Sequence, residues 1–275
     1  MPDDPAILRF ENVSLYFGDT PALENISLEM RAAETMIVLG AAGSGKTTLL
    51  KAAMGLVHPD SGRITLLGRD VTALKESQLI ELRAGVGILF QEGGLFDSMT
   101  VGANVAYPLM NQPSLRASLA ANNGHLEERV RDALRFVELE QTFDKFPSEL
   151  SGGMRRRVGI ARAVVTEPAL VLYDSPTAGL DPITANTIVN LIIKERDLRN
   201  TAAIMVTYRY QDGHLMANFR YNPNSGGIEH ISAREGGDNI TNTRFLVMNE
   251  GRVVFEGSQQ ELKRASDPYV RKFVK

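Results

Sequence analysis

Short apolar runs alternate along most of this chain with segments whose apolar residues recur at helical spacing. The first pattern is typical of buried strands and the second of amphipathic helices. Strands are predicted at residues 7–17, 26–30, 35–39, 63–67, 86–90, 169–174 and 202–207. Because helical segments separate most of these strands, the pattern favours an α/β fold with a mainly parallel sheet and an antiparallel N-terminal β part.

Three regions differ from this α/β core, which we assign to residues 1–90 and 166–207. Residues 91–165 predict a helical subdomain, because apolar residues between 126 and 137 face one side of a helix and charged residues the other. Residues 209–243 are polar and rich in Gly and Asn, so we expect a surface insertion that is partly disordered. Residues 244–275 predict a hairpin and a terminal helix with a break near Pro268.

Residues 40–47 read Gly-Ala-Ala-Gly-Ser-Gly-Lys-Thr, which matches G-x-x-x-x-G-K-[ST]. The motif lies between an apolar strand and the helix-forming residues 48–54, the context in which it forms a phosphate-binding loop. Glycines let backbone N–H groups converge on phosphate oxygens, and the helix N-terminus adds partial positive charge. An ordinary Gly-rich turn is the structural alternative.

The loop predicts a site for a nucleotide and Mg²⁺. Lys46 is expected to reach the β- and γ-phosphates, and the hydroxyl of Thr47 to bind the metal. Asp174 ends an apolar strand, where a carboxylate can be a second Mg²⁺ ligand or merely cap a turn. The expected nucleotide-binding residues of the loop are Gly40, Ala41, Gly43, Ser44, Gly45, Lys46, Thr47 and Thr48.

Composition narrows the class of partner. The chain has 275 residues, 43% of them hydrophobic, and a net charge of −3, so it carries no strong basic excess and nucleic acid is not an expected partner. Without cysteine, disulfides and thiolate metal sites are excluded. The acidic residues 1–5 do not resemble a secretory signal, and we expect no membrane span. The expected location is the cytoplasm.

Further motifs extend the pattern. Leu150-Ser151-Gly152-Gly153-Met154 precedes a predicted helix, which Ser151 can cap. With residues 40–47, Gln91, Asp174 and the run 178–181 ending at Asp181, this order resembles the ATP-binding subunit of an ABC transporter, a P-loop NTPase with a RecA-like core. The resemblance covers nearly the whole chain except residues 209–243.

The resemblance implies ATP as substrate, with Mg²⁺ held by Thr47, Gln91 and Asp174, and Phe17 stacked on adenine, for which Tyr16 is an alternative. It also implies a head-to-tail dimer, in which Ser151, Gly152, Gly153 and Met154 contact the ATP of the other subunit. The dimer is expected to be a homodimer, with a heterodimer as the alternative.

Met154, the run Arg155–Arg157 and residues 94–109 resemble the Mla/MCE lipid-transport ATPases in particular. This branch implies phospholipid transport, a transmembrane permease bound through residues 91–109, and an MCE-type substrate-binding protein. The chain would then lie peripherally on the cytoplasmic side of the inner membrane. Core packing of the apolar residues in 91–109 and a solvated face for the three arginines are the structural alternatives.

Two positions depart from the family. Ser175 stands where the family has a glutamate that polarises the attacking water, and Tyr208 stands where it has a histidine. A serine hydroxyl cannot accept a proton at pH 7 as a carboxylate can, so turnover is expected to be low while nucleotide binding survives. Tyr208 can still donate a hydrogen bond to a phosphate.

Several explanations of Ser175 stay open. In the first, hydrolysis is slow. In the second, another residue replaces the glutamate, namely Gln91, Asp181, Asp212 or His214. In the third, the partner subunit supplies the competent site. A laboratory substitution, which would more usually be Gln, is a further one. Two rival functions are a nucleotide-gated regulatory subunit and a soluble ABC ATPase outside transport.

Overall fold

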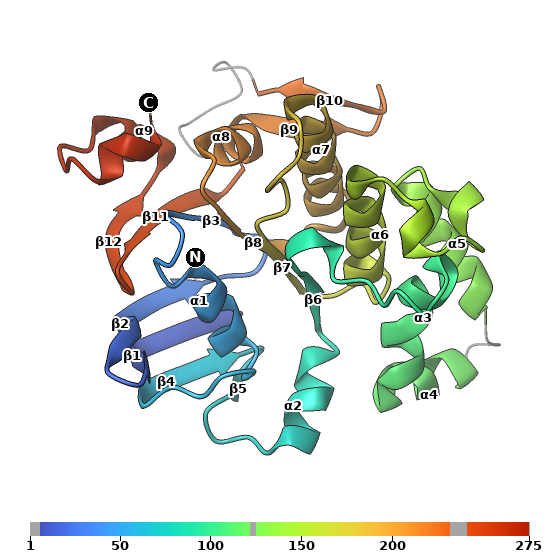
Figure 1. Cartoon of the computed structure of the whole chain (residues 1–275), viewed down its shortest axis with the longest axis horizontal. Coiled ribbons are helices and arrows are strands. Elements are labelled where there is room, and N and C mark those ends of the chain that lie inside the picture. Colours follow the sequence, from blue (N-terminus) through green and yellow to red (C-terminus); the bar gives the residue numbers. More distant parts are fainter. Residues whose placement is uncertain (1–5, 122–124, 232–240, 275) are drawn as a thin grey trace.

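A six-stranded sheet runs through the middle of the molecule (Figure 1). Five neighbouring strands are parallel and the edge strand β12 is antiparallel, which confirms the mainly parallel α/β sheet. The computed structural model describes residues 6–121, 125–231 and 241–274, so the predicted features at 1–5 and 232–240 lie outside it. The sheet order is β12 (Arg252–Gly257), β11 (Thr243–Asn249), β3 (Thr35–Gly40), β8 (Ala202–Thr207), β7 (Leu170–Asp174) and β6 (Val86–Leu89).

Both faces of this sheet are covered, which explains why its strands read as continuous apolar runs. In β3 every residue is buried. Ile37 and Leu39 join one hydrophobic cluster, whereas Met36 and Val38 join the other. The alternation follows from the period of two along a strand and sends successive side chains into separate cores.

An antiparallel sheet and α1 (Lys46–Ala53) cover one face of the central sheet. The first two strands form a long hairpin, which confirms the antiparallel N-terminal part and extends the strand predicted at 26–30 back to Thr20. This sheet has the order β2 (Thr20–Met30), β1 (Leu8–Phe17), β4 (Ser61–Leu66) and β5 (Arg69–Asp70).

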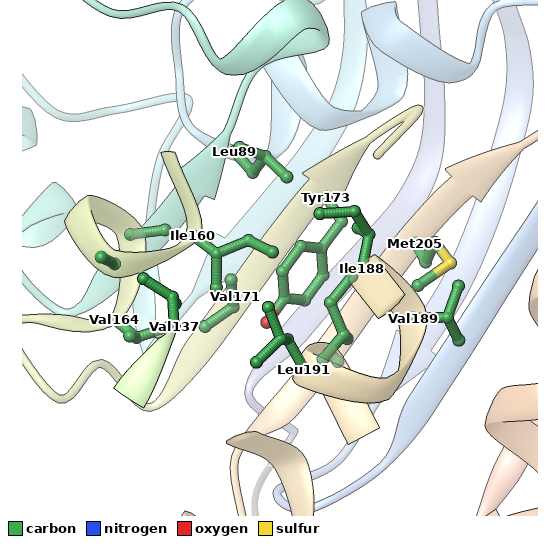
Figure 2. Packing of buried hydrophobic residues seen from close by; sticks show 14 of the residues in the cluster. Leu89, Val137, Ile160, Val164, Val171, Tyr173, Ile188, Val189, Leu191 and Met205 are labelled. Atoms are coloured by element: carbon green, nitrogen blue, oxygen red, sulfur yellow. The ribbon is translucent and has the colours of Figure 1, made fainter. Parts of the chain in front are cut away.

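Two long helices cover the other face, α6 (Gly152–Val164) and α7 (Pro182–Arg199). Tyr173 of β7 lies fully buried between them, with Ile160 on one side and Ile188 on the other (Figure 2). The remaining helices before β7 are α2 (Glu76–Arg83), α3 (Val101–Asn111), α4 (Pro113–Ala121) and α5 (Leu126–Phe136), with 3₁₀ turns at Gln91–Gly93, Glu140–Thr142 and Pro147–Glu149. Residues 91–165, predicted as a helical subdomain, contain the helices α3 to α6 (Figure 1).

The segment predicted as a partly disordered insertion is ordered over much of its length. Helix α8 (Tyr210–Asn218) packs against the central sheet and buries Met216 completely. The strands β9 (Phe219–Asn222) and β10 (Gly227–His230) form a hairpin beside α7. Helix α8 has few apolar positions and lies in a polar stretch, so its sequence shows no clear helical pattern.

The C-terminal region also differs in part from the expectation. The predicted hairpin is present as β11 and β12, but the terminal helix is short, α9 (Gln259–Arg264). A 3₁₀ turn at Val270–Phe273 follows after Pro268. Ser258 caps α9 in a capping box with Glu261. No helix among the residues described is both long and apolar enough to cross a bilayer.

Helix α7 carries an unusual buried acid. Glu195 is 0% exposed, and neither carboxylate oxygen has a hydrogen-bond partner among the described residues. Its nearest opposite charge is Arg199, whose Nε lies 3.5 Å from Oε2. Burial raises the pKa of Glu195 to about 7, and the nearby Arg199 opposes that rise. The carboxyl is therefore half protonated near neutral pH.

We predict that Glu195 makes the stability of the protein fall as the pH rises. Its folded-state pKa of about 7 exceeds the ordinary 4.5, so its contribution is greatest below pH 4.5 and is lost as the pH rises through 7. The full span corresponds to about 3 kcal/mol. Glu195→Gln should remove this part of the pH dependence in urea unfolding measured from pH 4.5 to 8. Equal pH profiles for both proteins would contradict the prediction.

Candidate functional site

The loop of residues 40–47 joins β3 to α1 and is fixed by close backbone approach. Gly45 has φ +99°, and a Cβ there would lie 2.4 Å from the carbonyl oxygen of Ala22 in β2. A Cβ on Gly40 would lie 2.4 Å from Ser44 Oγ and 2.6 Å from the carbonyl oxygen of Met248 in β11. Only glycine fits either position, because any side chain would displace the backbone of a neighbouring strand or the loop itself.

The ammonium of Lys46 lies over this loop. It donates hydrogen bonds to the carbonyls of Gly40 (2.8 Å) and Ala41 (2.7 Å) and to Ser44 Oγ (3.2 Å). Burial lowers the pKa of Lys46, an effect that nearby Asp174 opposes. A partly buried cation over a glycine-rich loop at the start of a helix is suited to bind a polyphosphate.

Thr47 and Asp174 meet at the carboxyl end of the sheet, as expected. The Thr47 hydroxyl donates to Asp174 Oδ1 at 3.2 Å, and Asp174 is only 6% exposed. These hard oxygen donors fit Mg²⁺, which is usually held by one or two protein oxygens together with substrate phosphates. No cluster of three or more His, Asp or Glu side chains able to hold a metal occurs in the described ranges, so a metal cage made by protein side chains alone is not found there.

A cleft of about 770 Å³ opens over the loop and gathers most of the predicted residues. Tyr16 is not among the residues lining it, so the structure places Phe17, which is 60% exposed, rather than Tyr16 at the cleft. Gly40 and Ala41 form the start of the loop and do not line the cleft. The lining is Phe17, Thr20, Pro21, Ala22, residues 42–48, Gln91, Ser175, Ala178 and Tyr208.

Ser175 follows the Asp174 strand directly and lines the cleft in a left-handed conformation, with φ +50°. Its hydroxyl donates to Asp174 Oδ1 at 3.3 Å, and its N–H donates to the carbonyl of Val206 at 3.0 Å. Tyr208 lines the same cleft with 55% of its surface exposed. Ser175 and Tyr208, the two positions predicted to depart from the family, therefore lie in one cleft.

Residues 151–154, expected to contact the ATP of a second subunit and here called the signature, lie away from this cleft. Ser151 caps α6 by accepting a hydrogen bond from the Met154 N–H at 3.2 Å. A Cβ on Gly153 would lie 2.5 Å from Thr184 Cγ2, so this glycine allows α6 to approach α7 closely. None of residues 151–154 lines the cleft of its own chain. Their contact with a nucleotide held by another subunit stays a prediction.

Asp181 also lies outside the cleft. Its carboxylate accepts from the N–H groups of Ile183 and Thr184, both at 3.0 Å, and caps α7. A hydrogen bond from the Thr184 side chain has the largest effect on the pKa of Asp181 and lowers it. The backbone hydrogen bonds from Thr184 and Ile183 lower this pKa further. Within one chain Asp181 starts a helix, and the structure does not bring it to Ser175.

Sequence reasoning missed Arg156. The run Arg155–Arg157 had a solvated helix face as one interpretation, but Arg156 is only 4% exposed. Its guanidinium donates to the carbonyls of Ser175 (2.9 Å), Pro176 (3.1 Å) and Ala178 (2.9 Å). Arg156 thus connects the signature helix to the segment after Asp174. A charged residue within an otherwise apolar helical stripe was the available signal.

Asp212 holds the same segment from the opposite side. Its Oδ2 accepts from the hydroxyls of Thr177 (2.5 Å) and Thr207 (2.8 Å), and Arg209 Nε lies 3.7 Å from Oδ1. Burial raises the pKa of Asp212, while these hydrogen bonds and Arg209 counteract the rise. Neither Asp212 nor His214 lines the cleft, so the structure does not place them where they could replace a glutamate at 175.

A second, apolar groove of about 400 Å³ lies between the helical subdomain and the core. From the predicted permease region it takes Gly94, Phe96, Tyr107 and Pro108. The rings of Phe96 and Tyr107 lie 4.6 Å apart, and Phe96 is 40% exposed. Leu95, in contrast, packs against the core. The region therefore contributes both to a surface groove and to core packing.

We predict that Arg156→Ala destabilises the fold by about 3 kcal/mol, because it removes three charge-assisted hydrogen bonds at a buried position. Arg157→Ala is the matched control, since Arg157 donates a single bond of 3.2 Å to the carbonyl of Val137. It should cost about 1 kcal/mol in the same denaturant titration. Equal losses of unfolding free energy in the two variants would show that the three hydrogen bonds of Arg156 contribute no more than the one of Arg157.

Comparison with known proteins agrees with this geometry. A family model described as ABC transporter matches residues 23–178. The sulfate/thiosulfate import ATP-binding protein CysA 2 of Shewanella oneidensis is 32% identical over 268 residues, 97% of this chain and 66% of that protein. The methionine import ATP-binding protein MetN of Leifsonia xyli is 37% identical over 209 residues, 75% and 59% of the two chains.

The intermembrane phospholipid transport system ATP-binding protein MlaF of Haemophilus influenzae is 29% identical over 269 residues, 98% of this chain and 90% of that protein. The chain thus spans about six tenths of the sulfate and methionine relatives but most of the phospholipid one.

Solved structures are similar throughout. A dimeric ATP-binding cassette in a post-hydrolysis state with ADP and Pi matches with a TM-score of 0.73 and 26% identity, over 91% of this chain and 98% of that chain. A nucleotide-free cassette from an ABC transporter matches with a TM-score of 0.70 and 26% identity, over 98% and 99% of the two chains. Together with the family model, these similarities show that the chain belongs to the ABC transporter family and has the fold of its ATP-binding domain.

Proposed function

We propose that this chain is the ATP-binding, energy-coupling subunit of an ABC transporter. The observation that carries the proposal is the cleft lined by residues 42–48, with the Lys46 ammonium over the loop and the Thr47 hydroxyl bonded to the buried Asp174. The loop would hold the phosphates, Thr47 and Asp174 the Mg²⁺ with Gln91 beside them, and Phe17 the base. Bound Mg²⁺ would supply charge neutralisation at the phosphate oxygens.

The cleft supports slow hydrolysis. The Ser175 hydroxyl donates a 3.3 Å hydrogen bond to Asp174, and a neutral hydroxyl there has no capacity to accept a proton from water. Binding groups and backbone geometry are otherwise complete, and the segment after Asp174 is held by Arg156 and Asp212. ATP binding would therefore close the dimer effectively, and hydrolysis would reset it slowly.

A nucleotide-gated subunit without effective hydrolysis is the second candidate. Ser175 and Tyr208 both favour it, because each replaces a polar group that acts on the attacking water or the γ-phosphate in the resembling family. In a heterodimer the other ATPase would then supply the competent site. Steady-state phosphate release separates this candidate from slow hydrolysis.

The position of residues 151–154 supports a head-to-tail dimer. Ser151 caps the start of α6 and residues 152–154 form its first turn, outside the cleft of their own chain, so they would complete a nucleotide site when a second subunit presents its loop. Ile183 lies at the start of α7 and is 80% exposed, so it offers an apolar side chain for contact with a second subunit. A homodimer is proposed, with a related ATPase as the other option.

We infer that the apolar groove beside residues 91–109 receives a transmembrane permease. Its lining includes exposed rings and Arg162, whose guanidinium lies 5.9 Å from the centre of the Phe96 ring. Large exposed apolar side chains gathered in a groove are typical of an interaction site. Through the permease the chain would lie on the cytoplasmic side of the membrane. A soluble ABC ATPase outside transport would not need this groove.

For the cargo we propose a phospholipid, delivered with the help of an MCE-type substrate-binding protein. The phospholipid relative is matched over 90% of its length, whereas the sulfate and methionine import relatives are substantially longer than this chain. Met154 and the run Arg155–Arg157 also carry the lipid-transport resemblance.

We predict that Ser175→Glu raises the turnover number for Mg-ATP by about 100-fold or more, because a positioned general base is worth about 10²–10⁴ in rate. The wild-type backbone at 175, with φ +50°, is already held by Val206 and Arg156 and needs no rearrangement. Phosphate release measures the effect, and Lys46→Ala should abolish it. Vigorous wild-type turnover that Lys46→Ala abolishes would contradict slow hydrolysis.

We predict that Phe96→Asp prevents co-purification with the permease and leaves ATP affinity unchanged, because it places a charge in the apolar groove. Val254→Asp is the control, since Val254 is a similarly exposed apolar residue on the distant edge strand β12. Mass spectrometry of detergent-solubilised complexes should detect a permease and an MCE-type protein with the wild type and the control. Detection of a sulfate or methionine permease instead would contradict the lipid assignment.

A further inference from the structure

The C-terminal segment, residues 266–274, reaches back to the nucleotide loop. The hydroxyl of Tyr269 accepts a hydrogen bond from the N–H of Ala41 at 3.2 Å and donates one to the carbonyl of Met248 at 3.1 Å. Ala41 is the second residue of the loop, and Met248 lies near the end of β11. One side chain thus joins three segments that are far apart in the sequence.

The Ala41 residue that Tyr269 contacts also touches the phosphate-binding lysine. The Ala41 N–H is bound by Tyr269, while its carbonyl accepts from Lys46 Nζ at 2.7 Å. Gly40 beside it is wedged against the carbonyl of Met248, to which Tyr269 also donates. If Lys46 turns to a phosphate, as the proposed function requires, the Ala41 carbonyl would lose its cation, and the bond from the Ala41 N–H to Tyr269 would remain to hold the start of the loop.

The hydroxyl is held in place by its own segment. Asp267 Oδ1 accepts from the N–H groups of Tyr269 (2.8 Å) and Val270 (3.0 Å), which fixes the turn. The ring of Phe273 packs edge-on against Tyr269 with centroids 5.3 Å apart. Val270 is 0% exposed and belongs to the main hydrophobic core. The side chain is therefore preorganised, and little ordering is needed for its two hydrogen bonds.

We propose that Tyr269 is a positioning residue for the nucleotide loop, and that docking of the C-terminal segment and binding of Mg-ATP strengthen each other. The coupling is reciprocal: if the docked segment raises nucleotide affinity by a given factor, bound nucleotide stabilises docking by the same factor. The inference rests on the ATP binding proposed above. It adds a control point in a segment outside residues 23–178, which the family model matches.

Tyr269→Phe tests the inference, because it removes the hydroxyl and keeps the ring that packs on Phe273. Loss of the hydrogen bond should weaken Mg-ATP binding by about three- to tenfold in calorimetry. The KM for ATP should rise by a similar factor while kcat stays unchanged, a split that general destabilisation would not produce. Tyr210→Phe is the matched control: it loses a 2.9 Å bond from Gln259 of α9 without touching the loop, and its affinity should equal that of the wild type.

Hydrogen exchange gives a second test, and its first comparison needs only the wild type. Mg-ATP should slow exchange of the amides in 269–274, and Tyr269→Phe should abolish that protection. Wild-type affinity in Tyr269→Phe, or exchange in 269–274 that nucleotide leaves unchanged, overturns the inference; if Tyr269→Phe fails to fold, the wild-type exchange decides. A wild type that binds no Mg-ATP refutes the proposed function instead, so the two failures are distinguishable.

Discussion

The close approach of the nucleotide loop to its neighbours is the constraint on which the site depends. Gly40 and Gly45 bring the loop backbone against the carbonyls of Met248 and Ala22, where even a methyl group would collide. These contacts come from two different sheets, so the loop acts as the junction between them. The Lys46 ammonium and the Thr47 hydroxyl then project from a loop whose path is already fixed, which keeps the cost of ordering the site low.

The segment after Asp174 shows a different balance between geometry and chemistry. Arg156 binds three of its carbonyls from α6, and Asp212 binds Thr177 from α8. Such a buried, charge-assisted network holds the backbone at Ser175 in a left-handed conformation that is uncommon for a residue other than glycine. The backbone at position 175 is thus firmly supported although its side chain is a hydroxyl. In the proposed function, positioning and proton transfer are separable contributions, and only the second would be reduced.

Contacts between residues far apart in the sequence connect the C-terminal part of the chain to the nucleotide loop. Tyr269 and Met248 reach the loop start, and Gly251 donates its N–H to the carbonyl of Ser44 at 3.2 Å. The hairpin β11–β12 and the C-terminal segment are therefore part of the support of the nucleotide site. Nothing in the spacing of Tyr269 from the motifs could have indicated this contact.

Local pattern and motif order determined the strands of the central sheet, the phosphate loop, the pairing of Thr47 with Asp174 and the family, because each depends on residue types at short, fixed spacing. The tertiary structure decided which aromatic faces the cleft, that Arg156 is buried, that Asp181 caps a helix and that α8 is ordered. Those features depend on which segments meet across the sheet, and side chains that meet through folding leave no periodic trace in the sequence.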